Sequence, residues 1–179
     1  MSIGNQHSPD QIAKDGLNAF RRGDYPTAIQ LYSEASTGYA ALGNHLLAAE
    51  MANNLSVCYL KAGDTQKALD VVDGTDALFA EAGDVHRQAI ALGNQAAALE
   101  GLGKYNQAVE KYEASSRLLK QAGALEDRAT VLQSLSELHL KMGHQLDAMG
   151  TMQIALLNKK KLSFFDRILK KLLKIPFGS

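Results

Sequence analysis

The sequence has few of the residues that cross-link, kink or anchor a chain. Its 179 residues include one cysteine, Cys58, three prolines and no tryptophan. A single thiol excludes an internal disulfide framework and is typical of a reducing compartment. No apolar run approaches the ~20 residues that cross a bilayer, and the N-terminal MSIGNQHSPD lacks the basic start and apolar core of a secretory signal. We therefore expect a cytoplasmic protein without a membrane-spanning helix.

The balance of charge is even overall but uneven along the chain. Hydrophobic residues make up 46% and charged residues 21%, which is ordinary for a folded protein, and the formal net charge is zero. Residues 159–179, called the tail below, nevertheless hold seven basic side chains against one aspartate, so residues 1–158, the body, are net acidic. Such a charge asymmetry is typical of a chain whose tail is an interaction segment.

Glycine recurs every 20 residues through most of the body, at positions 23, 43, 63, 83, 103, 123 and 143. Glycine directly after a helix takes the left-handed conformation that closes it. Four of these glycines are followed by residues that favour the N-cap of a helix: Asp24, Asn44, Asp64 and Asp84. The spacing predicts helices of about 17 residues joined by short turns. They form four helix pairs, over residues 9–42, 45–82, 85–122 and 125–158.

Small residues recur at fixed places on both helices of each pair. Twelve positions in this register hold only glycine, alanine, serine or threonine: Gly16, Ser56, Ala96, Ser136, Ala28, Ala68, Ala108, Ala148, Ala35, Thr75, Ser115 and Ala155. Small side chains let two helix axes approach closely. One helix pair leaves an apolar face uncovered, and stacked pairs cover each other, so the sequence predicts an all-α solenoid.

Five segments of these pairs resemble elements of the tetratricopeptide repeat. LSVCY, residues 55–59, resembles its Leu-Gly-x-x-Tyr element, and AIQLY, ALDVV, AVEKY and AMGTM resemble its Ala-x-x-x-Phe element. The resemblance covers residues 9–158. The period of 40 exceeds the usual ~34, as in the longer-helix repeats of kinesin light chains and Pins-like spindle adaptors. The resemblance implies a right-handed α-solenoid of four helix pairs plus a C-terminal amphipathic helix, and a protein that binds other proteins.

Nothing in the sequence indicates catalysis, a metal or a cofactor. The histidines make no HExxH or comparable ligand spacing, and His139 and His144 are not expected to share a helix face because a turn separates them. Residues 101–107, GLGKYNQ, follow no strand and so do not form a phosphate loop. Cys58 is expected to be an inert buried thiol. We expect a non-enzymatic protein.

The first helix of each pair is the expected binding surface. In tetratricopeptide proteins this helix lines a concave groove, and in the peptide-binding members its asparagines bind the backbone of an extended ligand. An amide suits this role because it offers both donors and an acceptor. Asn54 and Asn94 share one repeat position. The resemblance implies further groove contacts at Asn53, Lys14, Arg21, Lys61, Gln133 and Lys141. Alternatively, all of these are only the polar residues of a solvent-exposed helix face.

The tail is predicted to form one more helix. Ser163 and Asp166 have the spacing of a capping box, and Pro176 is expected to end the helix. Its apolar side holds Phe165, Ile168, Leu169, Leu172 and Leu173, and its basic side includes Lys170, Lys171 and Lys174. Ser163 keeps the repeat register and Leu172 aligns with Leu132, which favours a helix that caps the last pair. A basic amphipathic helix is also typical of binding to an anionic membrane surface, an acidic partner or a second copy.

Two functions from different classes follow. The first is a non-enzymatic adaptor or scaffold that binds a peptide or protein segment in the groove. The second is a peripheral membrane-associated assembly factor targeted by its C-terminal helix. A nucleic-acid partner is not expected, because the body is net acidic. Self-association through the tail stays open.

Overall fold

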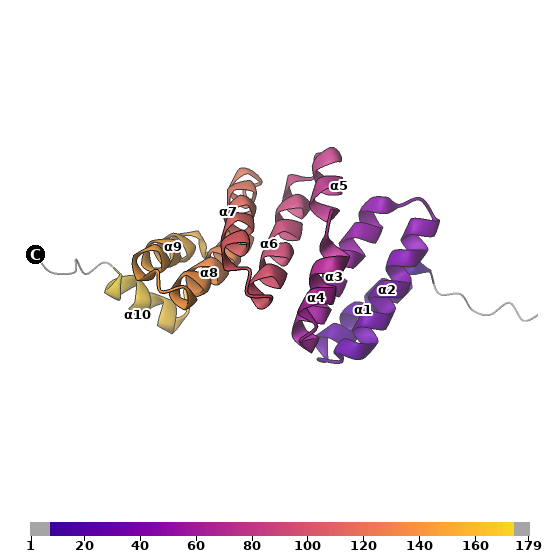
Figure 1. Ribbon diagram of the computed structural model, residues 1–179, viewed down its shortest axis with the longest axis horizontal. Coiled ribbons are helices and arrows are strands. Elements are labelled where there is room, and N and C mark those ends of the chain that lie inside the picture. Colours follow the sequence, from indigo (N-terminus) through magenta and orange to yellow (C-terminus); the bar gives the residue numbers. More distant parts are fainter. Residues whose placement is uncertain (1–7, 174–179) are drawn as a thin grey trace, which may run out of the picture.

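The computed structural model describes residues 8–173, and all regular structure in that range is helical. In chain order the helices are α1 Pro9–Arg21, α2 Tyr25–Ala41, α3 His45–Ala62, α4 Thr65–Val72, α5 Thr75–Glu81, α6 Val85–Gly101, α7 Tyr105–Gln121, α8 Leu125–Lys141, α9 Gln145–Asn158 and α10 Phe164–Leu172. Figure 1 shows them as consecutive helix pairs along the long axis of the molecule, from α1 at one end to α10 at the other. The expected all-α solenoid of helix pairs is confirmed.

One backbone geometry closes every turn of the predicted period. The seven glycines have φ between 71° and 84°, a region that suits a residue without a Cβ. In each turn the residue after the glycine donates its N–H to the carbonyl oxygen five positions earlier, over 2.8–3.0 Å. This bond belongs to the Schellman type of helix ending. Each turn therefore brings together two residues that are five apart in the sequence.

Side chains cap three of the four predicted helix starts. Asp24, Asn44 and Asp84 each accept a hydrogen bond from the backbone N–H three residues on, at 3.2, 3.3 and 2.9 Å. Asp64 does not, because its carboxylate pairs with Lys67 Nζ at 2.6 Å.

The small residues lie where the helices approach each other. All twelve of them are buried. The Ser56 and Ser136 hydroxyls each donate to the carbonyl oxygen of an alanine twelve positions on, Ala68 and Ala148, at 2.8 Å. A Cβ built on Gly16 would lie 3.2 Å from the Tyr32 ring. The residues of this pattern thus set how closely the two helices of a pair pack.

The second helix of the second pair differs from the prediction of one continuous helix. Helix α4 ends at Val72 and α5 begins at Thr75, because Asp73 is extended and Gly74 is left-handed with φ 73°. At the break, the Val72 carbonyl oxygen accepts hydrogen bonds from the Thr75 hydroxyl at 2.8 Å and from Gln95 Nε2 at 3.2 Å. Asp-Gly is a turn signal, so the sequence did mark this point.

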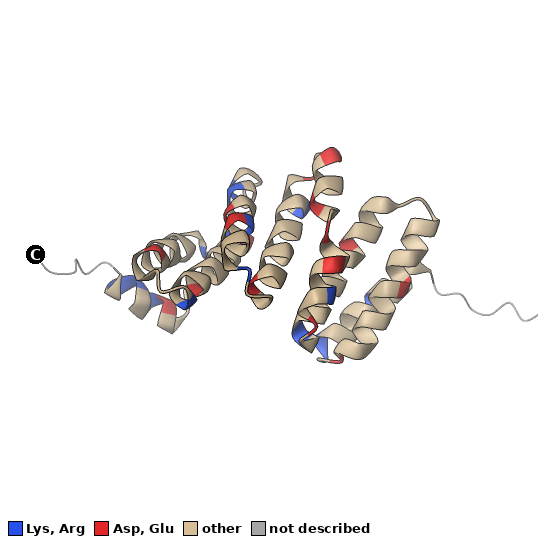
Figure 2. Cartoon of the chain, in the orientation of Figure 1, with Lys and Arg blue, Asp and Glu red and all other residues tan. Residues whose placement is uncertain are grey.

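The C-terminal helix begins as predicted but packs by one edge. Ser163 and Asp166 form the capping box, with bonds of 3.1 and 2.9 Å. Leu169 and Leu173 lie over a small hollow that Leu140 and Met152 of α8 and α9 also line. The expectation that Leu172 packs like Leu132 is wrong, since 54% of Leu172 is exposed against 5% of Leu132. Figure 2 shows basic residues along α10. Lys174 and Pro176 lie outside the described residues.

Candidate functional site

Polar side-chain contacts connect the first helices of neighbouring helix pairs along one face. Between α3 and α6, Asn94 Nδ2 donates to Asn53 Oδ1 at 3.0 Å, and Arg87 pairs with Glu50 at 3.4 Å. Between α6 and α8, a ring nitrogen of His86 lies 2.8 Å from Asp127 Oδ2 and Lys141 Nζ lies 3.9 Å from Glu100 Oε1. These bonds hold three successive first helices in fixed register.

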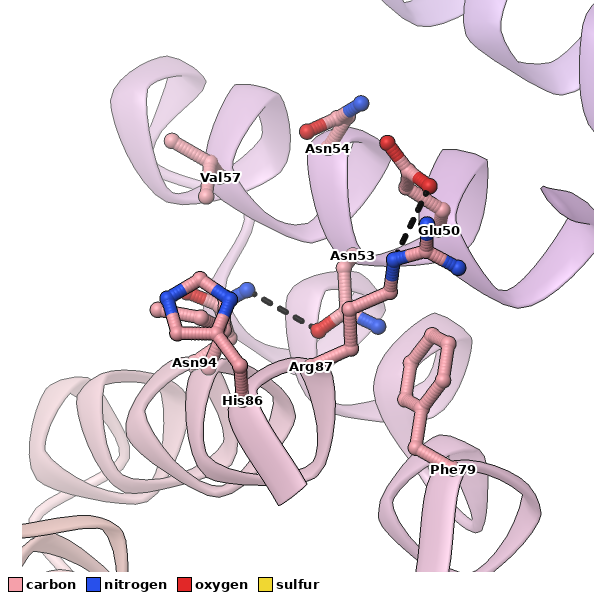
Figure 3. Close-up of a pocket in the computed structure, with 9 residues that line it drawn as sticks. Glu50, Asn53, Asn54, Val57, Phe79, His86, Arg87 and Asn94 are labelled. Carbon is pink, nitrogen blue, oxygen red and sulfur yellow. Dashed lines mark hydrogen bonds and ion pairs between the residues drawn. The ribbon is translucent and has the colours of Figure 1, made fainter. Parts of the chain in front are cut away.

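Two adjoining hollows lie between these helices, and together we call them the groove. The first, of about 290 Å³, lies between α3 and α6 and is bounded by Asn54, Val57 and Phe79 (Figure 3). The second, of about 230 Å³, lies between α6 and α8 and is lined by Ala97, Val131 and Ser134, among others. Ile90 and Asn94 line both hollows, so the groove is continuous along α6.

The structure brings Asn54 and Asn94 to this groove, as side chains that are neither buried nor fully exposed. The Asn94 amide uses one donor on Asn53 and keeps its oxygen unpaired among residues 8–173. The Asn54 side chain makes no hydrogen bond within the same range. Figure 3 shows the two amides on separate helices at the wall of the first hollow.

Asn53 also lines the first hollow, but its side chain is almost fully buried and already hydrogen-bonded. Only 6% of it is exposed, its Nδ2 donates to the Ala49 carbonyl at 2.9 Å and to Thr75 Oγ1 at 3.2 Å, and its oxygen accepts from Asn94. The Asn53 amide therefore uses its hydrogen-bonding groups within the protein. It connects the groove wall to the helix break, because the same Thr75 hydroxyl donates to the Val72 carbonyl.

The remaining groove candidates are exposed but line neither hollow: Lys14, Arg21, Lys61, Gln133 and Lys141. Lys141 is already paired with Glu100 and lies 4.9 Å from the centre of the Tyr105 ring. Gln133 Nε2 donates to Glu137 at 3.2 Å. The structure thus brings together the two asparagines but not the basic residues expected around them.

Charged residues that the sequence reasoning missed do border the groove. Glu50, His86, Arg87 and Asp127 line it in the two cross-helix pairs described above. Asn53–Asn94, His86–Asp127 and Glu100–Lys141 all join residues 41 positions apart. A search of the sequence for side chains that can bond each other at a spacing of 41, one more than the repeat length, would have found these pairs.

A histidine pair lies at the α8–α9 turn. His139 and His144 stand on either side of this turn and share no helix face, as expected, yet their ring centroids are only 6.1 Å apart. The turn brings the two rings together because the His144 N–H donates to the His139 carbonyl at 2.8 Å. Asp147 completes the cluster.

Burial sets the chemistry of two further side chains. It raises the pKa of the Cys58 thiol to about 11, so this fully buried cysteine stays protonated. Burial, followed by the charge of Glu100, also raises the pKa of Tyr112, whose hydroxyl donates to Glu100 at 3.3 Å. Tyr112 therefore offers the second hollow a neutral ring edge.

The comparisons with known proteins agree with the repeat geometry. Residues 16–72, from the middle of α1 to the end of α4, match the family model described as Tetratricopeptide repeat. No curated protein matches the chain significantly. None of the helices within residues 8–173 has both the length and the apolar character to cross a bilayer. Residues 16–72 are therefore similar to tetratricopeptide repeats, and the stacked helix pairs continue with the same 40-residue period beyond that match.

Proposed function

We propose that the protein is a non-enzymatic adaptor that binds an extended peptide or protein segment of a partner in the groove. Tetratricopeptide repeats bind protein partners in general, which supports an adaptor role. The observation that carries the proposal is the pair Asn54 and Asn94. Both line the wall of the first hollow and keep hydrogen-bonding groups unpaired among residues 8–173.

The groove suits an extended chain because both polar and apolar side chains line it. Val57, Ile90, Ala97 and Val131 give the hollows apolar surfaces that can receive side chains. The asparagine amides can donate to and accept from a ligand backbone, whose polar groups need partners once water is displaced. In this mode backbone hydrogen bonds give affinity and side-chain pockets give specificity.

The charges at the groove rim do not favour ligands of one sign. Arg87 pairs with Glu50, and a ring nitrogen of His86 lies beside the Asp127 carboxylate, so each of these basic side chains faces a carboxylate. Exposed pairs of this kind contribute about 0–1 kcal/mol and are screened by salt. We therefore propose that the backbone and apolar side chains of the ligand, rather than its net charge, determine binding.

The test is selection of binding peptides from a randomised displayed library on the full chain, followed by calorimetry with variants. Asn54→Ala should weaken binding by about 0.5–1.5 kcal/mol, the net value of one hydrogen bond. Ala97→Phe should block the second hollow and weaken binding further. The matched control is Asn106→Ala, an exposed amide on α7 outside both hollows. Equal affinity of parent, Asn54→Ala and Ala97→Phe for every selected peptide would rule out the groove.

A second candidate function rests on the exposed face of α10. Phe164, Phe165 and Leu172 are 71%, 80% and 54% exposed, although they are large and apolar. Arg167 and Lys171 are exposed on the same helix. We propose that this helix associates peripherally with an anionic membrane surface. Basic side chains near such a surface contribute about 1 kcal/mol each, an attraction that fades with salt.

Liposome flotation with and without anionic lipid tests this second proposal. Leu172→Asp should spare the melting temperature, since Leu172 is more than half exposed, and should reduce flotation. Leu169→Asp is the structural counterpart, because Leu169 packs towards α8 and α9 and its loss should loosen the helix. If the parent does not float with anionic vesicles at low salt, the membrane proposal fails.

A further inference from the structure

The turn between α8 and α9 gathers three side chains that can bind a metal. One ring nitrogen of His139, one of His144 and a carboxylate oxygen of Asp147 all lie within 4.8 Å of one another. His139 is in the last turn of α8, His144 is the N-cap of α9, and Asp147 is in the first turn of α9. The cluster is separate from the groove and from α10, since none of the three lines the hollows at either place.

The backbone fixes two of these residues relative to each other. Gly143 has φ 82°, and the His144 N–H donates to the His139 carbonyl oxygen over 2.8 Å. The same bond occurs at all seven turns, but only this turn carries histidine at both positions. The spacing His-x4-His-x2-Asp therefore works as a ligand set here because a glycine-closed turn lies inside it.

Within residues 8–173, no side-chain hydrogen bond involves either histidine ring. His139 is only 9% exposed, and its Nδ1 is buried without a hydrogen-bond partner among residues 8–173. Leaving a buried polar atom unpaired is unfavourable, because it has lost its bonds to water. His144 makes no side-chain capping bond, and its Nδ1 lies 4.0 Å from Asp147 Oδ2, which is too long for a hydrogen bond.

We propose that His139, His144 and Asp147 bind one Zn²⁺ ion. Two imidazoles with one carboxylate suit a first-row transition metal, whereas Mg²⁺ and Ca²⁺ prefer oxygen ligands alone. Zn²⁺ takes nitrogen and oxygen ligands at about 2.0–2.2 Å, so the ligand atoms must move closer together on binding. The side chains of His144 and Asp147 are 50% and 68% exposed and can rotate inwards, while buried His139 provides the fixed ligand.

The ion would tie the end of α8 to the start of α9. Coordination would also give the buried His139 ring a polar partner, which it lacks among residues 8–173. Three protein ligands leave a fourth position to water. Because the site exists only in the folded turn, Zn²⁺ should stabilise the fourth helix pair by an amount that grows with the logarithm of its concentration over its dissociation constant.

Calorimetric titration of Zn²⁺ into the metal-stripped full chain tests the site. The parent should bind one ion per chain at this cluster. His144→Ala and Asp147→Ala should each weaken binding by more than about tenfold, since loss of even an outer-shell partner costs a metal site roughly 10–100-fold. The matched control is His86→Ala, which removes a half-exposed histidine from a pair with one aspartate, 2.8 Å away. This control should bind like the parent.

The melting temperature and the absorption of bound Co²⁺ distinguish a loss of metal binding from a loss of folding. His144 is half exposed and makes no capping bond, so His144→Ala should melt like the metal-free parent. Zn²⁺ should then raise the melting temperature of the parent and of His86→Ala but not of His144→Ala. Co²⁺ in place of Zn²⁺ should give the absorption of a four-coordinate site in the parent and in His86→Ala but not in His144→Ala. Equal Zn²⁺ affinity of the parent and His144→Ala, or no saturable binding by the parent, would overturn the proposal.

Discussion

Replacing Ala108 with leucine should destabilise the whole array. Ala108 is 0% exposed and belongs to one buried cluster with Ala96, Leu99 and Tyr112, which joins α6, α7 and α8. It is also one of the positions that hold alanine in all four repeats, with Ala28, Ala68 and Ala148. Three added carbon atoms have no space at such a point unless the two helices separate.

The size of the effect follows from this closed packing. Extra methylene groups in a filled core cost about 1–3 kcal/mol, because side chains leave their rotamers and the backbone shifts. For a chain of this size each kcal/mol lowers the melting temperature by roughly 2–4 °C. Ala108→Leu should therefore melt about 2–12 °C below the parent, with the transition followed by circular dichroism.

Ala40→Leu on α2 is the matched control. It makes the same chemical change at an exposed helical position, where substitutions usually stay within about 0.5 kcal/mol. If Ala108→Leu melted no lower than Ala40→Leu, the assignment of this position to a close helix–helix contact would be refuted.

Three further predictions concern titrating groups. Cys58, with its pKa raised to about 11 by burial, should react with Ellman's reagent only as unfolding exposes it; fast labelling of the folded chain would contradict this. The bond from Lys159 lowers the pKa of Asp166 below 3.8, so α10 should lose stability as pH falls through that lowered pKa, seen as faster amide exchange. Burial and Asp10 raise the pKa of Tyr39 from 10.0 to about 12, so the stability of the parent should fall as pH rises from 10.0 towards 12. Tyr39→Phe should not show this loss.

The periodic features of the fold could be predicted from the sequence because one backbone rule repeats. Every turn glycine is left-handed, and every small residue in register is buried. The break at Gly74 was missed because Ala68 and Thr75 keep the repeat pattern on both sides of it. The residue that compensates for the break, Gln95, lies in another helix, and no local pattern links the two.

The candidate site could be predicted only in part. Register alone placed Asn54 and Asn94 on the same face, but it could not show that Asn53 turns inwards to Thr75. That outcome depends on the helix break, which brings the Thr75 hydroxyl to the Asn53 amide at 3.2 Å. The histidine cluster was missed for a different reason, since helical spacing does not apply across a turn.

The interaction between Asn94 and Asn53 also changes how the groove must be tested. Asn94→Ala would leave the buried Asn53 oxygen without its donor, and such a group costs about 1–3 kcal/mol. Weaker binding by Asn94→Ala could therefore come from a distorted groove wall rather than from a lost contact with the ligand. Asn54 makes no hydrogen bond within residues 8–173, so Asn54→Ala removes only a group offered to the ligand.

The most direct test of the central claim is a double-mutant cycle between Asn54 and the ligand backbone. A selected peptide is prepared with single N-methyl groups at successive backbone positions, and each form is titrated into the parent and Asn54→Ala by calorimetry. The account predicts one position whose methylation weakens binding to the parent by about 0.5–1.5 kcal/mol and leaves binding to Asn54→Ala unchanged. Equal losses in parent and variant at every position would show that the Asn54 oxygen accepts no hydrogen bond from a ligand N–H and would contradict the proposed contact.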